Sequence, residues 1–314
     1  MVQRWRRWRP AGRVTETATS LEVFARVAQR LRAAHISKRA WRKKQDLRPL
    51  TTLVDAARAE AYKLQKRPVE QLQVAEAWLY ALALSAPQAA VAQEEMDKHP
   101  HGYHNKEHRL FELIDFNDAF VASVLALPHD MLPHAEQWIR QLCDLTCQRA
   151  GTRRFSDEQY SAIVRGLSRE IAVYLGLQKE GFEAEMTSRR VDAFGIDMRI
   201  TDPKTLQSIN VDLKTRSAFH YRIHNLQREG RLSEEALIMA GRNGFTRVYN
   251  GHDGQKVPVV IWRIDEEEVG EIVDFTLERT DGLARMLRDI FARHYDVQNS
   301  KPLQHLSWCP VLYS

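Results

Sequence analysis

The chain has 314 residues, 44% of them hydrophobic, and a formal net charge of +5 at pH 7. This length is long for one compact domain and predicts two. No apolar run is long enough to span a bilayer, and the first ten residues, MVQRWRRWRP, lack the apolar core of a signal peptide, so we expect a soluble, cytoplasmic protein. Three cysteines, Cys143, Cys147 and Cys309, are too few for a disulfide framework. The first two, one helical turn apart, are expected in a core.

Basic residues are concentrated at the N-terminus. Residues 1–50 carry fourteen Lys or Arg against three acids, a net charge of +11, so the other residues carry a net charge of −6. Arginine neutralises phosphate and an indole ring stacks on an unpaired base, so this asymmetry favours a nucleic-acid partner. A solvated basic tail and an anionic membrane surface are the alternatives. The expected nucleic-acid contacts form two clusters around tryptophans: Arg4, Arg6, Arg7 and Arg9, and then Lys38, Arg39, Arg42, Lys43 and Lys44.

Helical periodicity dominates the first half of the chain, and strand-like alternation is missing from it. The sequence therefore predicts a basic, all-helical domain over residues 1–150 that binds nucleic acid. Prolines are expected to break the helical pattern near Pro87, Pro100 and Pro128. The predicted helices cover residues 20–34, 53–64, 68–84, 109–127 and 133–147.

The pattern changes after Gly151, where the second predicted domain, residues 151–314, begins. A capping-box spacing at Ser156 and Gln159 predicts a helix that Gly176 ends as a C′ glycine. Later segments predict strands over 182–187, 194–200, 209–215 and 257–264, a helical or irregular stretch over 223–240, and a closing helix over 281–295. The resulting order is α-β-β-β-α-β-α.

A histidine-rich segment contains His104, Glu107 and His108 in the spacing H-x-x-E-H, which occurs in one class of zinc metalloproteases. Spacing of four residues would place both imidazoles on one helix face. Such spacing also arises by chance in a polar, histidine-rich stretch, so a solvated or partner-facing cluster is favoured and a zinc metalloprotease is the remote alternative.

Two acids and a lysine occur together in the second domain. Asp197 follows a Gly-Ile turn, and alternation in a strand sends Asp212 and Lys214 to the same face. Glu170 borders the helix face that must pack on the sheet, where it either turns toward the two aspartates or pairs with Arg165 or Arg169 at the helix edge. Such residues can hold a divalent metal and activate water against a phosphodiester, or form a simple surface ion pair. Asp192 competes with Asp197, which we prefer because the preceding glycine permits a tight approach.

This order of elements, with Glu170, Asp197 and Asp212-Leu213-Lys214, resembles the PD-(D/E)xK nuclease superfamily over residues 157–264. The resemblance implies a restriction-endonuclease-like α-β-β-β-α-β core with a central mixed sheet. It implies that Mg²⁺ or Mn²⁺ is held by the two aspartates and the Leu213 carbonyl. Glu170 would orient the metal's waters or bind a second ion, and Lys214 would position and help deprotonate the attacking water. Phosphate contacts are expected from Arg189, Arg190, Arg199 and Arg216, and groove-lining side chains from Tyr221, His224, Asn225 and Gln227.

The sequence thus predicts a metal-dependent endonuclease with DNA as its expected substrate. Many nucleases of this kind act as dimers, so a homodimer is expected by resemblance alone. The alternative is a non-catalytic nucleic-acid-binding protein on the same scaffold.

Overall fold

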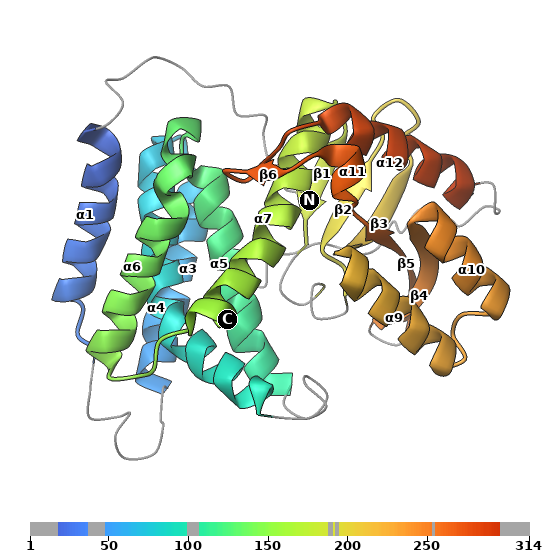
Figure 1. The fold of residues 1–314 in the computed structure, drawn as a ribbon. Helices are drawn as coiled ribbons and strands as arrows, with labels where there is room; N and C mark the ends of the chain where they lie inside the picture. Colours follow the sequence, from blue (N-terminus) through green and yellow to red (C-terminus); the bar gives the residue numbers. More distant parts are fainter. Residues whose placement is uncertain are drawn as a thin grey trace. The chain divides into compact units, whose positions relative to one another are not determined.

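The computed structural model describes residues 18–36, 48–98, 107–187, 191, 195–252 and 255–295. The fold is mixed α+β, with helices and a five-stranded mixed sheet (Figure 1). The chain divides into two compact units, one formed by residues 9–167 and one that contains residues 168–314. These units differ from the predicted domains, 1–150 and 151–314, in the assignment of residues 151–167.

The first unit is helical in its described part, and α4 (Gln71–Asp97) is its central element. Nearly every side chain of α4 from Trp78 to Ala92 is buried, which is expected for a helix that packs on all sides. Its partners are the helices that the sequence predicted over 20–34, 53–64, 109–127 and 133–147, which are confirmed as α1 (Ala18–Ala33), α3 (Arg48–Gln65), α5 (Glu107–Ala126) and α6 (Leu132–Ala150).

The predicted break at Pro87 is wrong, because Pro87 is buried inside α4. A proline in a helix interior costs about 3 kcal/mol through a lost hydrogen bond and a clash. Burial of the surrounding alanines and leucines between four helices outweighs this cost, a tertiary effect that local propensity does not contain. The break near Pro128 is confirmed, since α5 ends at Ala126 and a short 3₁₀ turn, η2 (His129–Met131), follows. Pro100 lies outside the described residues.

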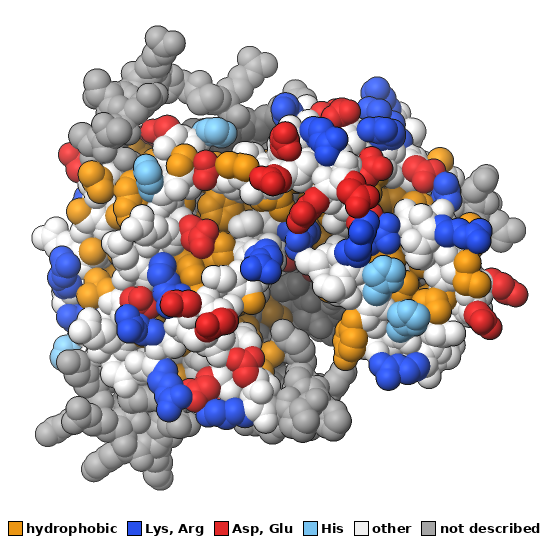
Figure 2. Space-filling model, in the orientation of Figure 1, with side chains coloured by type: hydrophobic (Ala, Val, Ile, Leu, Met, Phe, Trp, Pro, Cys, Tyr) orange, Lys and Arg blue, Asp and Glu red, His pale blue; other side chains and the backbone are white. Residues whose placement is uncertain are grey.

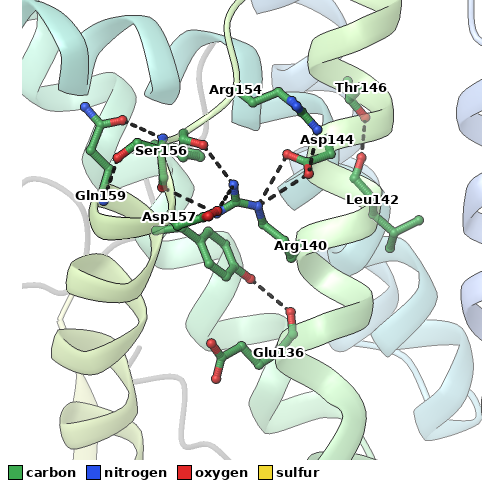
Figure 3. Close-up of polar contacts among 11 residues, drawn as sticks. Glu136, Arg140, Leu142, Asp144, Thr146, Arg154, Ser156, Asp157 and Gln159 are labelled. Atoms are coloured by element: carbon green, nitrogen blue, oxygen red, sulfur yellow. Dashed lines mark hydrogen bonds and ion pairs between the residues drawn. The ribbon is translucent and has the colours of Figure 1, made fainter.

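The beginning of α7 (Asp157–Lys179) is fixed by polar contacts with α6 (Figure 3). The amide N–H of Gln159 donates to Ser156 Oγ (3.1 Å), and the amide N–H of Ser156 donates to Gln159 Oε1 (2.9 Å), so the predicted capping box is confirmed. Arg140 of α6 donates to the Phe155 carbonyl (2.8 Å), and the Tyr160 hydroxyl donates to the carbonyl of Glu136 (3.1 Å). Together these bonds set where the helix starts.

Cys143 and Cys147 are buried in α6, as the sequence predicted. Burial raises the pKa of Cys147 to about 12 and that of Cys143 well above its ordinary value. We therefore expect alkylation by iodoacetamide at pH 8 to be at least about 10²-fold slower in the native protein than in guanidinium chloride, because only the thiolate reacts. Peptide mass mapping of both residues over time measures this ratio. Equal rates in the two conditions would show that α6 is not packed as described.

The second unit contains a sheet with strand order β1-β2-β3-β5-β4, in which β3 and β5 are parallel and the other pairs are antiparallel. The strands predicted over 182–187, 209–215 and 257–264 are confirmed, and so is the closing helix. Of the segment 194–200, only the part from Met198 is strand. The elements are β1 (Glu183–Met186), β2 (Met198–Thr201), β3 (Ser208–Lys214), α9 (Arg216–Arg228), α10 (Glu234–Asn243), β4 (Phe245–His252), β5 (Gln255–Arg263), α11 (Glu266–Val269), β6 (Ile272–Val273), β7 (Thr276–Leu277) and α12 (Thr280–Tyr295).

Both faces of β3 are covered, because residues 209–213 are all buried. Asp212 is in register with Ile261 of β5, so the two side chains share a face of the sheet. Ile261 packs in one apolar cluster with Phe219 and Ile223 of α9, which places α9 on the Asp212 face. In Figure 1, α9 and α10 lie on one side of the sheet and α12 on the other.

The prediction that Gly176 ends its helix is wrong. The helix continues to Lys179, and Gly181, with φ of +87°, supplies the left-handed cap while the N–H of Phe182 donates to Leu177 O (3.0 Å). A Cβ at Gly176 would lie 3.1 Å from the Leu283 side chain, so the missing side chain serves close packing of α7 on α12.

Gly282 is the site of a second close approach, between α11 and α12. A Cβ built there would overlap the backbone carbonyl oxygen of Glu268. We expect Gly282→Ala to lower the free energy of unfolding by about 2–3 kcal/mol, since backbone rather than a flexible side chain must move. Gly241→Ala is the matched control: it lies in α10 with nothing near its Cβ position, and alanine there should be neutral or stabilise by up to about 1 kcal/mol. Urea denaturation of both variants tests this, and equal stabilities would contradict it.

Candidate metal centre

Asp197 is fixed at the point where β2 begins. Its amide N–H donates to the Val211 carbonyl (2.8 Å), and its Oδ2 accepts from the amide N–H of Leu213 (2.6 Å). The amide N–H of Thr187 donates to the Asp197 carbonyl (3.1 Å), so the chain after β1 also holds this residue. Backbone groups from two sides therefore orient the carboxylate beside the end of β3.

Asp212 and Lys214 lie on the same face of β3, as alternation predicted. Lys214 Nζ donates to Asp212 Oδ1 and approaches the carbonyl of Leu213 (3.3 Å). The Asp212 side chain is 5% exposed and that of Lys214 is 28% exposed. The carboxylate is thus enclosed, whereas the ammonium lies at the border with solvent.

A left-handed turn brings the backbone close to Asp212. Gly195 has φ of +72°, a region that favours glycine, and a Cβ there would lie 4.0 Å from Asp212 Oδ2 and 3.5 Å from Asn250 Nδ2. This is the tight approach that the Gly-Ile-Asp sequence predicted. Asp192, the competing ligand, lies outside the described residues.

Electrostatics link three carboxylates to the ammonium of Lys214. The pKa of Asp212 is raised to about 7, first by burial and then by the nearby carboxylate of Asp197. Lys214 and Arg222 act in the opposite direction on Asp212. For Lys214, burial would lower the pKa, but Asp197, Asp212 and Glu170 together raise it above its ordinary value. Glu170, half-buried on α7, therefore belongs to the same electrostatic cluster as the two aspartates.

The oxygen atoms of this cluster fit a hard divalent cation. Among the described residues, none donates a hydrogen bond to Asp197 Oδ1 or Asp212 Oδ2. Nor does the described part of the chain bring three or more His, Cys, Asp or Glu side chains together as a metal-binding group. The oxygen atoms that would hold such an ion are those of the two carboxylates and the Leu213 carbonyl, and water would have to complete its shell. Mg²⁺ commonly keeps several waters in this way, and Mn²⁺ also takes oxygen ligands.

Arg222 of α9 is a member of this site that sequence reasoning missed. It is half-buried and close enough to Asp212 to affect its pKa. The only local signal is its place on α9, between the buried Phe219 and Ile223 and so at the edge of the packed face. The sequence alone does not show that this edge lies over Asp212, because that depends on how α9 packs on the sheet.

Several predicted residues do not join the described cluster. Arg216 contacts Asp265 and Glu267, each at 3.4 Å, so acids partly neutralise its charge. Arg199 is half-buried on β2. The zinc-motif side chains of His104, Glu107 and His108 lie outside the described part. The same holds for Arg189, Arg190 and both N-terminal clusters: Arg4, Arg6, Arg7, Arg9, Lys38, Arg39, Arg42, Lys43 and Lys44.

No helix in the described part of the chain combines the length and apolar character needed to cross a membrane. Comparison of the chain with protein-family models, with curated proteins and with solved structures gives no match.

Proposed function

We propose that this protein is a metal-dependent nuclease that hydrolyses phosphodiester bonds, with DNA as the expected substrate. The observation that carries the proposal is the meeting of Asp197, Asp212 and Lys214 at one end of β3, with Glu170 of α7 close enough to act on the charge of Lys214. The topology supports it: a helix, three antiparallel strands, a helix and a strand parallel to β3 occur in the order that the resemblance implies, with α10 and β4 as additions.

A simple structural ion pair accounts poorly for this cluster. Lys214 and Arg222 both act on Asp212, yet a second aspartate and a glutamate also act on Lys214, so acids outnumber basic groups in the cluster. Burying the Asp212 carboxylate costs stability, and buried ion pairs contribute little by themselves. A carboxylate whose pKa is raised as strongly as that of Asp212 is common at functional sites. A bound cation would relieve the repulsion between Asp197 and Asp212.

Each residue of the site would have a separate role in hydrolysis. Asp197, Asp212 and the Leu213 carbonyl would hold the ion, which when bound supplies a Lewis acid for the phosphate and lowers the pKa of water. Lys214 carries a proton at neutral pH, because the surrounding acids raise its pKa. It is therefore suited to donate a hydrogen bond to the attacking water or to a phosphate oxygen, rather than to accept a proton.

The test is cleavage by the full-length protein of supercoiled plasmid, linear duplex, single-stranded DNA and RNA, with Mg²⁺, with Mn²⁺ and with EDTA. We expect cleavage of at least one DNA by the wild type, and none with EDTA or with Asp212→Asn. Asp202→Asn is the matched control: Asp202 lies in the β2–β3 turn, at the opposite end of the hairpin, and caps the turn through the Lys204 amide (2.9 Å). If every polymer stays intact with either metal, the nuclease proposal fails and a non-catalytic binding protein becomes the better account.

A further inference from the structure

Helix α9 begins at the candidate metal centre. Its N-cap, Thr215, directly follows Lys214, and the Thr215 hydroxyl accepts a hydrogen bond from the Ala218 amide (3.1 Å). The sequence of the helix, RSAFHYRIHNLQR, contains three arginines and two histidines and no acid. A helix of this composition next to the site carries positive charge that complements a polyanion.

Helix α9 has one face buried against the sheet and one face exposed to solvent. Phe219, Ile223 and Leu226 are buried against the sheet, which fixes the orientation of the helix. Tyr221 is 70% exposed, although a phenol ring is a large apolar surface to leave in water. The other exposed side chains on the helix are polar or basic: Arg216, Ser217, His220, His224 and Arg228. In Figure 2, histidines lie next to Lys or Arg side chains over this part of the molecule.

The guanidinium of Arg222 lies near Asp212 on the half-buried edge of α9. Among the described residues, none accepts a hydrogen bond from it, and no carboxylate lies within ion-pair distance of its guanidinium. Arg216, one and a half turns earlier, does contact two acids. A guanidinium has five N–H donors in a planar fork that matches phosphate oxygens, so Arg222 is available for a ligand beside Asp212.

We propose that α9 binds the strand that is cut, with Arg222 contacting a phosphate next to the scissile bond and Tyr221 stacking on an unpaired base. This inference rests on the proposed function and specifies its ligand as single-stranded or locally unpaired nucleic acid. Bases inside a duplex present only their edges, whereas the face of an unpaired base is open to a tyrosine ring.

The experiment measures binding by fluorescence anisotropy, using the full-length protein with a labelled single-stranded oligonucleotide and with its duplex. Every sample carries the Asp212→Asn substitution and contains Ca²⁺ in place of Mg²⁺, so that the oligonucleotide is not cleaved during the measurement. Arg222→Gln should weaken binding of both forms about tenfold. It should also reduce the slope of log Kd against log salt concentration by about one, because one phosphate contact is lost. Tyr221→Ala should weaken single-strand binding about tenfold and leave duplex binding within about twofold. Arg242→Gln, which removes an exposed charge from α10, is the matched control and should change Kd by less than about twofold.

Thermal unfolding of each variant shows whether it is folded, and Arg222→Lys, which keeps the charge but loses the planar fork, replaces Arg222→Gln if that variant unfolds. If the folded Arg222 and Tyr221 variants bind as tightly as the Asp212→Asn protein without them, the inference is overturned, even where the wild type shows Mg²⁺-dependent cleavage. An equal loss of duplex and single-strand binding in Tyr221→Ala would overturn the stacking role. A protein that cuts nothing, yet loses single-strand binding in these variants, would support α9 as a binding surface while the nuclease proposal fails.

Discussion

Asp212→Asn is expected to reduce Mg²⁺-dependent cleavage by about 10²–10⁴-fold, the range typical of removing one positioned catalytic group. The same substitution is expected to stabilise the metal-free protein. Asparagine has nearly the shape of aspartate, so the enclosed site between β2, β3 and α9 should keep its packing. It removes a negative charge that burial and Asp197 disfavour. Loss of activity with gain of stability is the signature of a residue kept for function.

The stability gained by Asp212→Asn over the wild type should increase as the pH rises. The pKa of Asp212 is about 7 in the folded protein and roughly 4 in an unfolded chain, so the fold disfavours the ionised form. The wild type therefore loses stability relative to Asp212→Asn as pH rises from about 4 through 7. Between pH 5 and pH 8 the difference in unfolding free energy should grow by on the order of 1–3 kcal/mol. Urea denaturation with EDTA at both pH values measures it, and a constant difference would contradict the burial of an ionisable Asp212.

Lys214→Gln is expected to reduce the cleavage rate by about 10²–10³-fold, since a positioned charge next to the phosphate is lost. Unlike Asp212→Asn, it should destabilise the protein, by about 1–3 kcal/mol, because Asp212 and Asp197 then share a partly enclosed site without the ammonium. Lys214→Arg should not restore the rate, because the longer, planar guanidinium cannot occupy the same position. Single-turnover kinetics and denaturation in EDTA give the two quantities.

Lys204→Gln is the control for this prediction, since Lys204 is an exposed lysine in the β2–β3 turn. It should leave both rate and stability unchanged. If Lys214→Gln cleaves at the wild-type rate while remaining folded, Lys214 has only a structural role. If Lys214→Gln is as stable as the wild type, the negative charge around the ammonium is smaller than described.

Features set by neighbouring residues could be predicted from the sequence. The capping box at Ser156 depends on groups three residues apart, and the common face of Asp212 and Lys214 follows from strand alternation alone. The glycine turn before Asp197 likewise follows from backbone freedom at Gly195. These local rules place Asp212 and Lys214 on one face, whereas the position of Asp197 beside them depends on the pairing of β2 with β3.

Features set by distant residues could not be predicted. Pro87 stays helical because four helices bury α4, and Gly176 lies within its helix because α12 packs on it. Strand β4 was missed because FTRVYNGH mixes polar residues and glycine, and its pairing with β5 is not visible in its own pattern. Arg222 joins the site only through the packing of α9 on the sheet.

The most direct test of the central claim is the rate at which the full-length protein cleaves one labelled DNA as a function of Mg²⁺ concentration, for the wild type and for Asp197→Asn. We expect the wild-type rate to rise from zero and saturate. Asp197→Asn should need at least about tenfold more Mg²⁺ and reach a lower maximum, because it loses an oxygen ligand. A wild-type rate that does not depend on the metal, or the same titration curve for both proteins, would contradict a metal centre at the end of β3.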